Sequence, residues 1–409
     1  MSGQTLTAAA PVWLMDVGST VIKLLRTGPS GVTGPPVRET RQRGVAPGDQ
    51  AARLLARSGF APSAGALRAC SSAGSGPTVG VVGLTGRYSI AAAVRATVTA
   101  GADVSYTRTL HTPVEAPLPL VDVLVMVGGV DGTDHGRLER AVRAMRLSEH
   151  PHRILVWAGA HDAAAAAALR PHHRAGNVID GQLRADCGPL AQTLRHIHLA
   201  DIVDRQGLRA LSELLGAPVP ATPDAVGDAT RELAAERGGT APVLVVDVGG
   251  STTDVHRCAA AGPSAPGPGW GESQVFSGLG VAGARRSLLA RLTDTPVLDE
   301  FVGAVAPADR RTRYLRLREG DSTALPPQDA ALACLFLALR QLPEEHRASL
   351  PCDTRLLVTG GAVAGLAPGR LSAVAEAACG AGPFTHPPAV DTTPGLWARG
   401  LLARRPAPA

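Results

Sequence analysis

Apolar runs interrupted by a glycine-hydroxyl turn occur twice in this chain. Residues 12–26 read VWLMDVGSTVIKLLR, and residues 243–258 read VLVVDVGGSTTDVHRC. In both segments β-forming residues flank the turn, which predicts a strand, a tight turn and a returning strand. The copies begin about 230 residues apart, a spacing that indicates one supersecondary unit used twice, once to open each lobe.

Between the two copies, apolar runs alternate with stretches of helical pattern. VGVVGL (79–84), VDVLVMVGG (121–129) and HRILVWAGA (152–160) are each followed by an alanine- or arginine-rich amphipathic segment. This alternation predicts βαβ units with parallel strands. After residue 186 the pattern becomes helical, which closes the first half of the chain.

The pattern therefore predicts an α/β protein of two lobes. GGTAP (238–242) is the expected hinge, with the first lobe at 11–238 and the second at 241–403. Residues 354–367, TRLLVTGGAVAGLA, are expected to form the last strand, turn and helix. A chain of 409 residues is too long for one compact core, which agrees with this division.

The two repeated turns carry the candidate chemistry. In each, an apolar strand delivers a carboxylate, Asp16 or Asp247, and a glycine and hydroxyl residues follow. Backbone N–H groups and hydroxyls of such turns can surround phosphate oxygens, while the carboxylates hold Mg²⁺. One such turn alone is more often a plain hairpin turn capped by its Asp. Two copies favour a nucleotide clamped between them.

We accordingly expect three sets of site residues. The carboxylates expected at the metal are Asp16, Asp247 and Asp254, of which Asp16 and Asp247 are also the candidate catalytic residues. The residues expected to cradle phosphates are Gly18, Ser19, Thr20, Gly249, Gly250, Ser251, Thr252 and Thr253. Gly360 and Gly361 are expected to lie against an adenine ring and ribose, although a strand-Gly-Gly turn can also be purely steric.

Lys23 is the only lysine among the 40 Lys and Arg residues. It lies three residues after Thr20, on the returning strand. A lysine is ordinarily a solvated surface charge, but a compact ammonium is also the point charge that phosphate sites use. In a chain that uses arginine everywhere else, its place beside the turn favours a functional role.

The composition makes some classes of binding partner and some cellular locations less plausible than others. The net charge is +5, but only 18% of residues are charged and the two signs are interspersed, so nucleic acid is not the expected partner. Six scattered cysteines without a CxxC pair indicate reduced thiols. The start lacks a basic and apolar leader pattern, and no apolar run could span a bilayer. We therefore expect a cytoplasmic protein without membrane partners.

With these motifs in place, the chain resembles the glutamate mutase accessory protein family, called MutL or GlmL and unrelated to the DNA mismatch-repair protein. The resemblance also extends to the superfamily of acetate and sugar kinases, heat-shock chaperones and actin. It is carried by DVGST with Lys23, CSSAGSG (70–76), VGVVGLT (79–85), LVMVGGVDG (124–132), ILVWAG (154–159) and DVGGSTTDVH (247–256).

The resemblance implies a two-lobed, actin-like ATPase architecture with duplicated ribonuclease H-like lobes and additional βαβ units in the first half. It implies ATP and Mg²⁺ as cofactors, weak ATPase activity, and adenosylcobalamin-dependent mutase subunits as partners, reactivated by exchange of damaged cobalamin. Residues 275–281 lack the carboxylate of an acidic family segment, and Ser251 stands where alanine is usual. A small-molecule kinase and an ATP-binding scaffold without turnover are the alternatives. The sequence does not distinguish a homo-oligomer from a hetero-oligomer.

Overall fold

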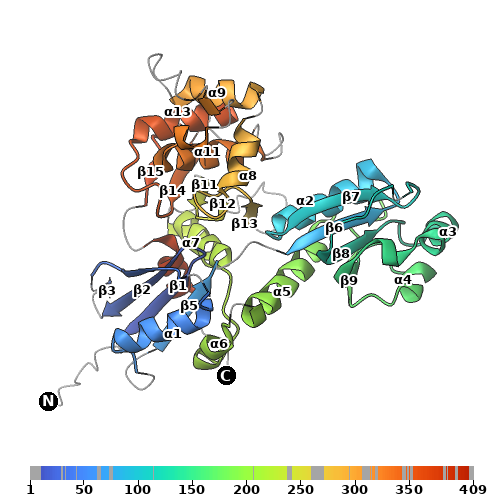
Figure 1. Cartoon of the computed structure of the whole chain (residues 1–409), viewed down its shortest axis with the longest axis horizontal. Coiled ribbons are helices and arrows are strands. Elements are labelled where there is room, and N and C mark those ends of the chain that lie inside the picture. Colours follow the sequence, from blue (N-terminus) through green and yellow to red (C-terminus); the bar gives the residue numbers. More distant parts are fainter. Residues whose placement is uncertain are drawn as a thin grey trace. The chain divides into compact units, whose positions relative to one another are not determined.

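The protein is described from a computed structural model, in which the chain forms two compact units (Figure 1). The composite unit consists of residues 1–74 and 201–409, and the inserted unit consists of residues 75–200. The residues that the structure describes are 11–28, 31–32, 34–42, 44–61, 66–72, 77–113, 115–205, 207–236, 242–258, 271–293, 295–305, 314, 316–317, 321–342, 347, 350, 353–380, 384, 386–391 and 395–404.

The first sheet of the composite unit contains the first repeated hairpin. Strands β1 and β2 are antiparallel, and β1 pairs in parallel with β5 on its other side. The order is β3-β2-β1-β5, with β4 also paired to β2. The strand bounds are β1 Val12–Val17, β2 Val21–Gly28, β3 Gly31–Val32, β4 Val37–Thr40 and β5 Ala66–Ser71.

The second sheet repeats this arrangement with the order β13-β12-β11-β14-β15. Again the hairpin is antiparallel and the next strand is parallel, and Asp16↔Lys23 in the first sheet has its counterpart in Asp247↔Asp254. The strand bounds are β11 Val243–Val248, β12 Thr252–Cys258, β13 Gly271–Ser277, β14 Arg355–Thr359 and β15 Ala389–Val390. This shared order confirms the predicted α/β architecture of two like lobes.

Alternation along the strands explains how each sheet is buried. On β1, Trp13, Met15 and Val17 face a core built with helices α1 (Pro47–Arg57) and α6 (Arg209–Leu215). Leu14 faces the opposite core, with α7 (Thr222–Glu236) and α14 (Leu396–Ala403). Successive side chains of a strand point to opposite faces, so a strand covered on both sides is mostly apolar. Each such side chain contributes about 1.5–3 kcal/mol relative to an exposed one.

Two helices of the composite unit run between its sheets (Figure 1). Helix α7 packs on β11, β12 and β13 of the second sheet, and α14 packs on β1 and β5 of the first. The helix bounds in this unit are α1 Pro47–Arg57, α6 Arg209–Leu215, α7 Thr222–Glu236, α8 Arg285–Leu292, α9 Thr295–Val305, α11 Pro327–Arg340, α13 Pro368–Cys379 and α14 Leu396–Ala403, with a 3-10 turn at Ser322–Ala324.

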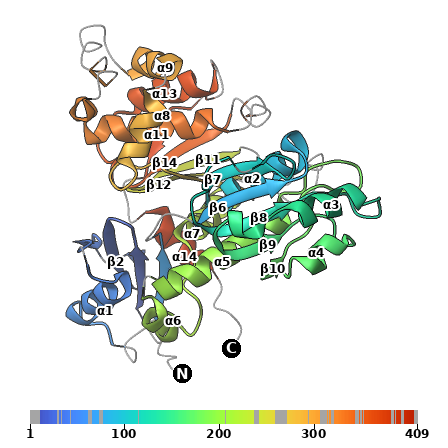
Figure 2. The same ribbon diagram turned by 45° about the vertical axis from the view of Figure 1, so that its right-hand side comes forward.

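The inserted unit is a parallel sheet with helices on both faces, as the predicted βαβ units require (Figure 2). Its order is β10-β9-β8-β6-β7; α2 and α5 cover one face and α3 and α4 the other. The bounds are β6 Thr78–Gly83, β7 Asp103–Thr109, β8 Val121–Val127, β9 His152–Trp157, β10 His173–Arg174, α2 Ala91–Thr99, α3 Gly136–Ala144, α4 Ala164–Ala168 and α5 Gly188–Arg205, with a π-helix at Gly86–Ile90 and a 3-10 turn at Leu147–Glu149.

One predicted element is wrong and one boundary stays a prediction. Residues 361–365 form turns, and the helix begins only at Pro368, because Gly360 adopts φ +118° and proline suits a first helical position. β15 and α14 then follow, so 354–367 is not the last such unit. The predicted lobe boundary, between residues 238 and 241, lies outside the described residues. Among the helices that the structure describes, none is long and apolar enough to cross a bilayer.

Candidate functional site

Each repeated hairpin closes in the same way. The Gly18 amide donates to the Val21 carbonyl over 3.1 Å, and the Gly249 amide donates to the Thr252 carbonyl over 2.8 Å. A Cβ on Gly249 would come within 2.9 Å of that same carbonyl oxygen, so the turn requires glycine. The two turns are therefore local copies, as the sequence predicted.

The two turns also meet in space. A Cβ added to Gly250 would collide with the Thr20 methyl and lie 2.8 Å from its hydroxyl oxygen. One cavity of about 310 Å³ is lined by both turns and by the glycine pair that follows β14. Of the predicted site residues, those that line it are Asp16, Gly18, Ser19, Thr20, Lys23, Asp247, Gly249, Gly250, Gly360 and Gly361.

One hydroxyl of the second turn is used within the protein. The Thr253 hydroxyl is buried and donates to the Leu279 carbonyl over 2.8 Å. The turn backbone is held from the same side, because the Val281 amide donates to the Gly249 carbonyl over 3.2 Å. Ser251, Thr252, Thr253 and Asp254 are not among the described residues that line this cavity. Their predicted ligand contacts stay predictions.

Asp16 is already paired. Lys23 Nζ donates to Asp16 Oδ2 over 2.8 Å, and Thr222 Oγ1 donates to Asp16 Oδ1 over 2.9 Å. The carboxylate is only 2% exposed. Burial disfavours the lysine charge, but the charge of Asp16 and the hydrogen bond to it more than compensate and raise the pKa of Lys23. The two side chains therefore form a partly buried ion pair.

Asp247 occupies the equivalent place in the second sheet with a different neighbour. Burial raises the pKa of Asp247 to about 6; Lys23 opposes this shift, and Asp16 and Asp391 add to it. Its cross-strand neighbour Asp254 is 3% exposed, and burial followed by the charge of Asp247 raises the pKa of Asp254 well above its usual value. At neutral pH, Asp247 is thus mostly ionised, whereas burial shifts Asp254 toward its protonated form.

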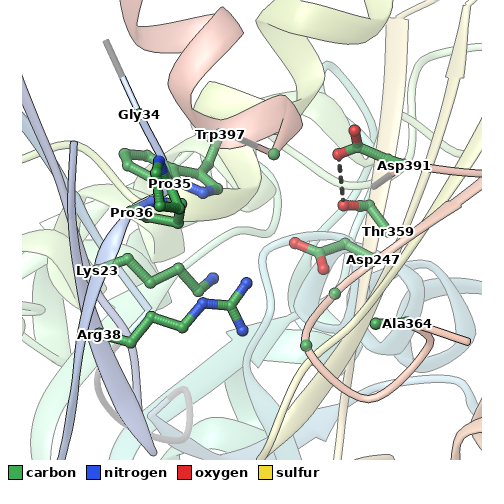
Figure 3. Close-up of a pocket in the computed structure, with 13 residues that line it drawn as sticks. Lys23, Gly34, Pro35, Pro36, Arg38, Asp247, Thr359, Ala364, Asp391 and Trp397 are labelled. Atoms are coloured by element: carbon green, nitrogen blue, oxygen red, sulfur yellow. Dashed lines mark hydrogen bonds between the residues drawn. The ribbon is translucent and has the colours of Figure 1, made fainter. Parts of the chain in front are cut away.

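A second cavity of about 540 Å³ shares Lys23, Arg38, Asp247 and the glycine pair with the first. In Figure 3, Lys23 and Arg38 extend from one wall toward Asp247 on the other. Lys23 Nζ lies 5.9 Å from the centroid of the Trp397 ring. The remaining lining residues are Gly34, Pro35, Pro36, Thr359, Ala364, Asp391 and Gly395.

Sequence reasoning missed several residues of these cavities, among them Arg38, Thr222, Asp391 and Trp397. Asp391 accepts a hydrogen bond from the Thr359 hydroxyl over 2.9 Å and from the Leu396 amide, the first of α14, over 3.0 Å. Asp391 precedes the N-cap position, which is Gly395, so the local sequence does not mark it as a capping residue. Its place beside Asp247 depends on strand pairing across the sheet, which the local sequence does not encode.

Two other glycine-rich segments, 70–76 and 128–132, are part of the family resemblance. Ser72 of the first lines the smaller cavity, and residues 73–76 lie outside the described residues. The second, 128–132, follows β8 in the inserted unit. There Asp162 accepts a hydrogen bond from the Gly132 amide over 2.9 Å, and that bond lowers the pKa of Asp162.

The chain is similar in sequence to known proteins. The family model described as MutL protein matches residues 12–336. Protein MutL of Clostridium tetanomorphum is 30% identical over 201 residues, a match that covers 46% of this chain and 43% of that protein. The match thus spans less than half the length of that relative.

Similar solved structures include nucleotide-free acetone carboxylase, with a TM-score of 0.36 at 12% identity over 97% of this chain and 70% of that chain. Component A of (R)-2-hydroxyglutaryl-CoA dehydratase from Acidaminococcus fermentans has a TM-score of 0.32 at 9% identity, over 96% of this chain and 97% of that one. We base no functional conclusion on likenesses of this size.

Proposed function

Because the chain belongs to the MutL protein family, we propose that it binds Mg·ATP between its two repeated turns and hydrolyses it slowly. We further propose that it acts as a reactivating accessory protein of an adenosylcobalamin-dependent mutase of the glutamate mutase type. The observation that carries the nucleotide part is the contact of Gly250 with Thr20, which gives both turns one cavity.

The donors and carboxylates of this cavity fit a nucleotide and a metal. Turn amides that are not bonded within the hairpins, together with the Ser19 and Thr20 hydroxyls, can surround phosphate oxygens. Asp247, ionised at neutral pH, is the carboxylate that would hold Mg²⁺. In the described residues no three His, Cys, Asp or Glu side chains form a metal site, and Mg²⁺ commonly uses one or two carboxylates and water.

Each side chain then has a distinct task. Bound Mg²⁺ would neutralise charge on the phosphates. Asp16, fixed by Lys23 and Thr222, is placed to orient a water molecule through its carboxylate oxygens. Turn amides that face a bound phosphate would stabilise the charge that develops on its oxygens. Gly360 and Gly361 lie where a flat base and ribose can approach the backbone.

The accessory role rests on the family rather than on this site. Two lobes that contact ATP and ADP differently can bias a partner's conformation, because a ligand shifts an equilibrium only by its differential affinity for the two states. A small-molecule kinase would instead release ADP in response to a substrate without any partner protein. A scaffold would bind ATP tightly and show negligible turnover even with a mutase present.

The decisive experiment compares Asp247→Ala with wild type. We expect the fold to persist, Mg-dependent ATP affinity measured by calorimetry to fall at least about tenfold, and ATP turnover and rescue of an inactivated mutase to disappear. Glu213→Ala, an exposed acid on α6, is the matched control and should behave as wild type. Rescue of the mutase by the Asp247→Ala protein would contradict the mechanism.

A further inference from the structure

One row of charged side chains crosses the first sheet. Asp16 on β1 is opposite Lys23 on β2, and Lys23 is opposite Arg38 on β4. Residues directly opposite one another in antiparallel strands project from the same face. The row therefore presents a carboxylate, an ammonium and a guanidinium in succession to the cavities between the sheets.

The two cations of this row differ in what they are free to bind. Lys23 Nζ is committed to Asp16 at 2.8 Å, so most of its charge is neutralised by its partner. Arg38 makes no side-chain hydrogen bond or ion pair with any residue that the structure describes. Its side chain is exposed, and it lines both the 310 Å³ and the 540 Å³ cavity.

The corresponding row of the second sheet offers no cation. It runs from Asp247 through Asp254 to Val275. Among the described residues that line the two cavities, Lys23 and Arg38 are the basic ones. A triphosphate bound at the turns therefore meets one positive charge that is not already neutralised, that of Arg38.

The position of Arg38 indicates which phosphate it meets. In Figure 3 its guanidinium points across the larger cavity toward Asp247. Asp247 is the proposed metal carboxylate, and Mg²⁺ bridges the terminal phosphates in enzymes that transfer or hydrolyse them. Those phosphates would lie between Asp247 and Arg38. A guanidinium can bind phosphate oxygens through two parallel hydrogen bonds, which an ammonium cannot do.

We propose that Arg38 binds the terminal phosphate of ATP, while Lys23 is a positioning residue that holds Asp16. This inference rests on the proposed nucleotide site and adds a residue to it. It also gives the protein a means to distinguish ATP from ADP, because the contact of Arg38 is lost together with the terminal phosphate.

The test is calorimetric binding of Mg·ATP and Mg·ADP to the full chain carrying Arg38→Gln. We expect ATP affinity to fall at least about tenfold and ADP affinity to change less than about threefold, since one charge-assisted contact is removed. Arg38→Lys should recover part of the ATP affinity and not all of it. Arg53→Gln, an exposed arginine on α1, is the matched control and should bind both nucleotides as wild type does.

Each outcome has a separate meaning. Unchanged ATP affinity in Arg38→Gln, with wild type binding ATP, would overturn the role of Arg38 and leave the proposed site intact. Equal losses for ATP and ADP would overturn the assignment to the terminal phosphate. Failure of wild type to bind ATP would refute the proposed function itself. Thermal melting of each variant shows that it is folded, which an exposed edge-strand position favours.

Discussion

At the scale of single residues, the two hairpins use the same Asp position in opposite ways. Asp16 faces Lys23 across its strand pair and accepts a hydrogen bond from it, whereas Asp247 faces a second acid, Asp254. Neighbouring charges and burial shift the pKa of a carboxyl group. The hairpins therefore differ at this position: one pairs its Asp with a cation, and the other provides an Asp whose pKa is raised to about 6.

The raised pKa of Asp247 predicts a pH dependence of metal-assisted binding. Below about pH 6 the free protein holds a proton on Asp247 that Mg²⁺ must displace, so Mg·ATP affinity should fall by about tenfold per pH unit there and level off above pH 7. Calorimetry between pH 5 and about pH 8 measures this. Asp247→Asn removes the titrating carboxyl group, so the Mg·ATP affinity that remains in this variant should not decline in the same way at low pH. A decline of equal size in the variant would show that it arises from protonation of the nucleotide.

At the scale of elements, the site depends on how closely two tight turns approach. Gly250 packs on the side chain of Thr20, and Thr20 is β-branched, so it has little rotational freedom with which to move away. Glycine is therefore needed at position 250 for the contact between the two turns, and not only for the conformation of its own turn. Backbone amides of the 278–284 segment donate hydrogen bonds to the carbonyls of Gly249 and Gly250 and so fix the second turn.

A double-mutant cycle tests this packing. Gly250→Ala should separate the turns and weaken ATP binding by about tenfold, because the new methyl group occupies the place of the Thr20 side chain. Adding Thr20→Ala should restore part of the affinity, since it removes the atoms in the way. The measurement is ATP affinity for both single variants and the double variant. Strictly additive losses would show that the two turns do not touch.

At the scale of the whole molecule, the lobes of the composite unit are tied together by exchanged helices. Helix α7 starts at Thr222, which binds Asp16, and then covers the second sheet; α14 follows Asp391, which binds Thr359, and covers the first sheet. The two helices also pair by charge, because Arg399 of α14 donates to Glu232 of α7 over 2.7 Å. Both thus start beside the site and connect it to the opposite lobe.

Gly400 shows how close these helices are. A Cβ there would overlap the backbone carbonyl of Ala225 on α7. Helix propensity alone would favour alanine by about 1 kcal/mol, but the clash with rigid backbone should outweigh it and cost about 1–3 kcal/mol. We expect Gly400→Ala to lower the melting temperature by several degrees, whereas Gly303→Ala on α9, which has open space, should raise it or leave it unchanged. Similar effects of both changes would contradict the close approach.

The local elements of the site could be predicted because their causes are local. Asp16, Gly18, Asp247 and Gly249 follow from strand patterns and turn chemistry within fifteen or so residues, and their hairpins form as expected. The parallel strands of the inserted unit follow from the same kind of alternation. The late start of α13 did not follow, because the apolar run after Gly361 suits a helix while the glycine conformations favour turns.

The sequence by itself determined that two like hairpins exist, that each carries an Asp and a glycine turn, and that one lysine stands beside the first. Only the tertiary structure decided that Gly250 meets Thr20 and that Lys23 is neutralised by Asp16. It also decided that Arg38 is the basic residue of the cavities whose side chain has no partner among the described residues. The reason is physical: period and turn chemistry act over a few residues, whereas strand order and helix exchange bring together groups hundreds of residues apart.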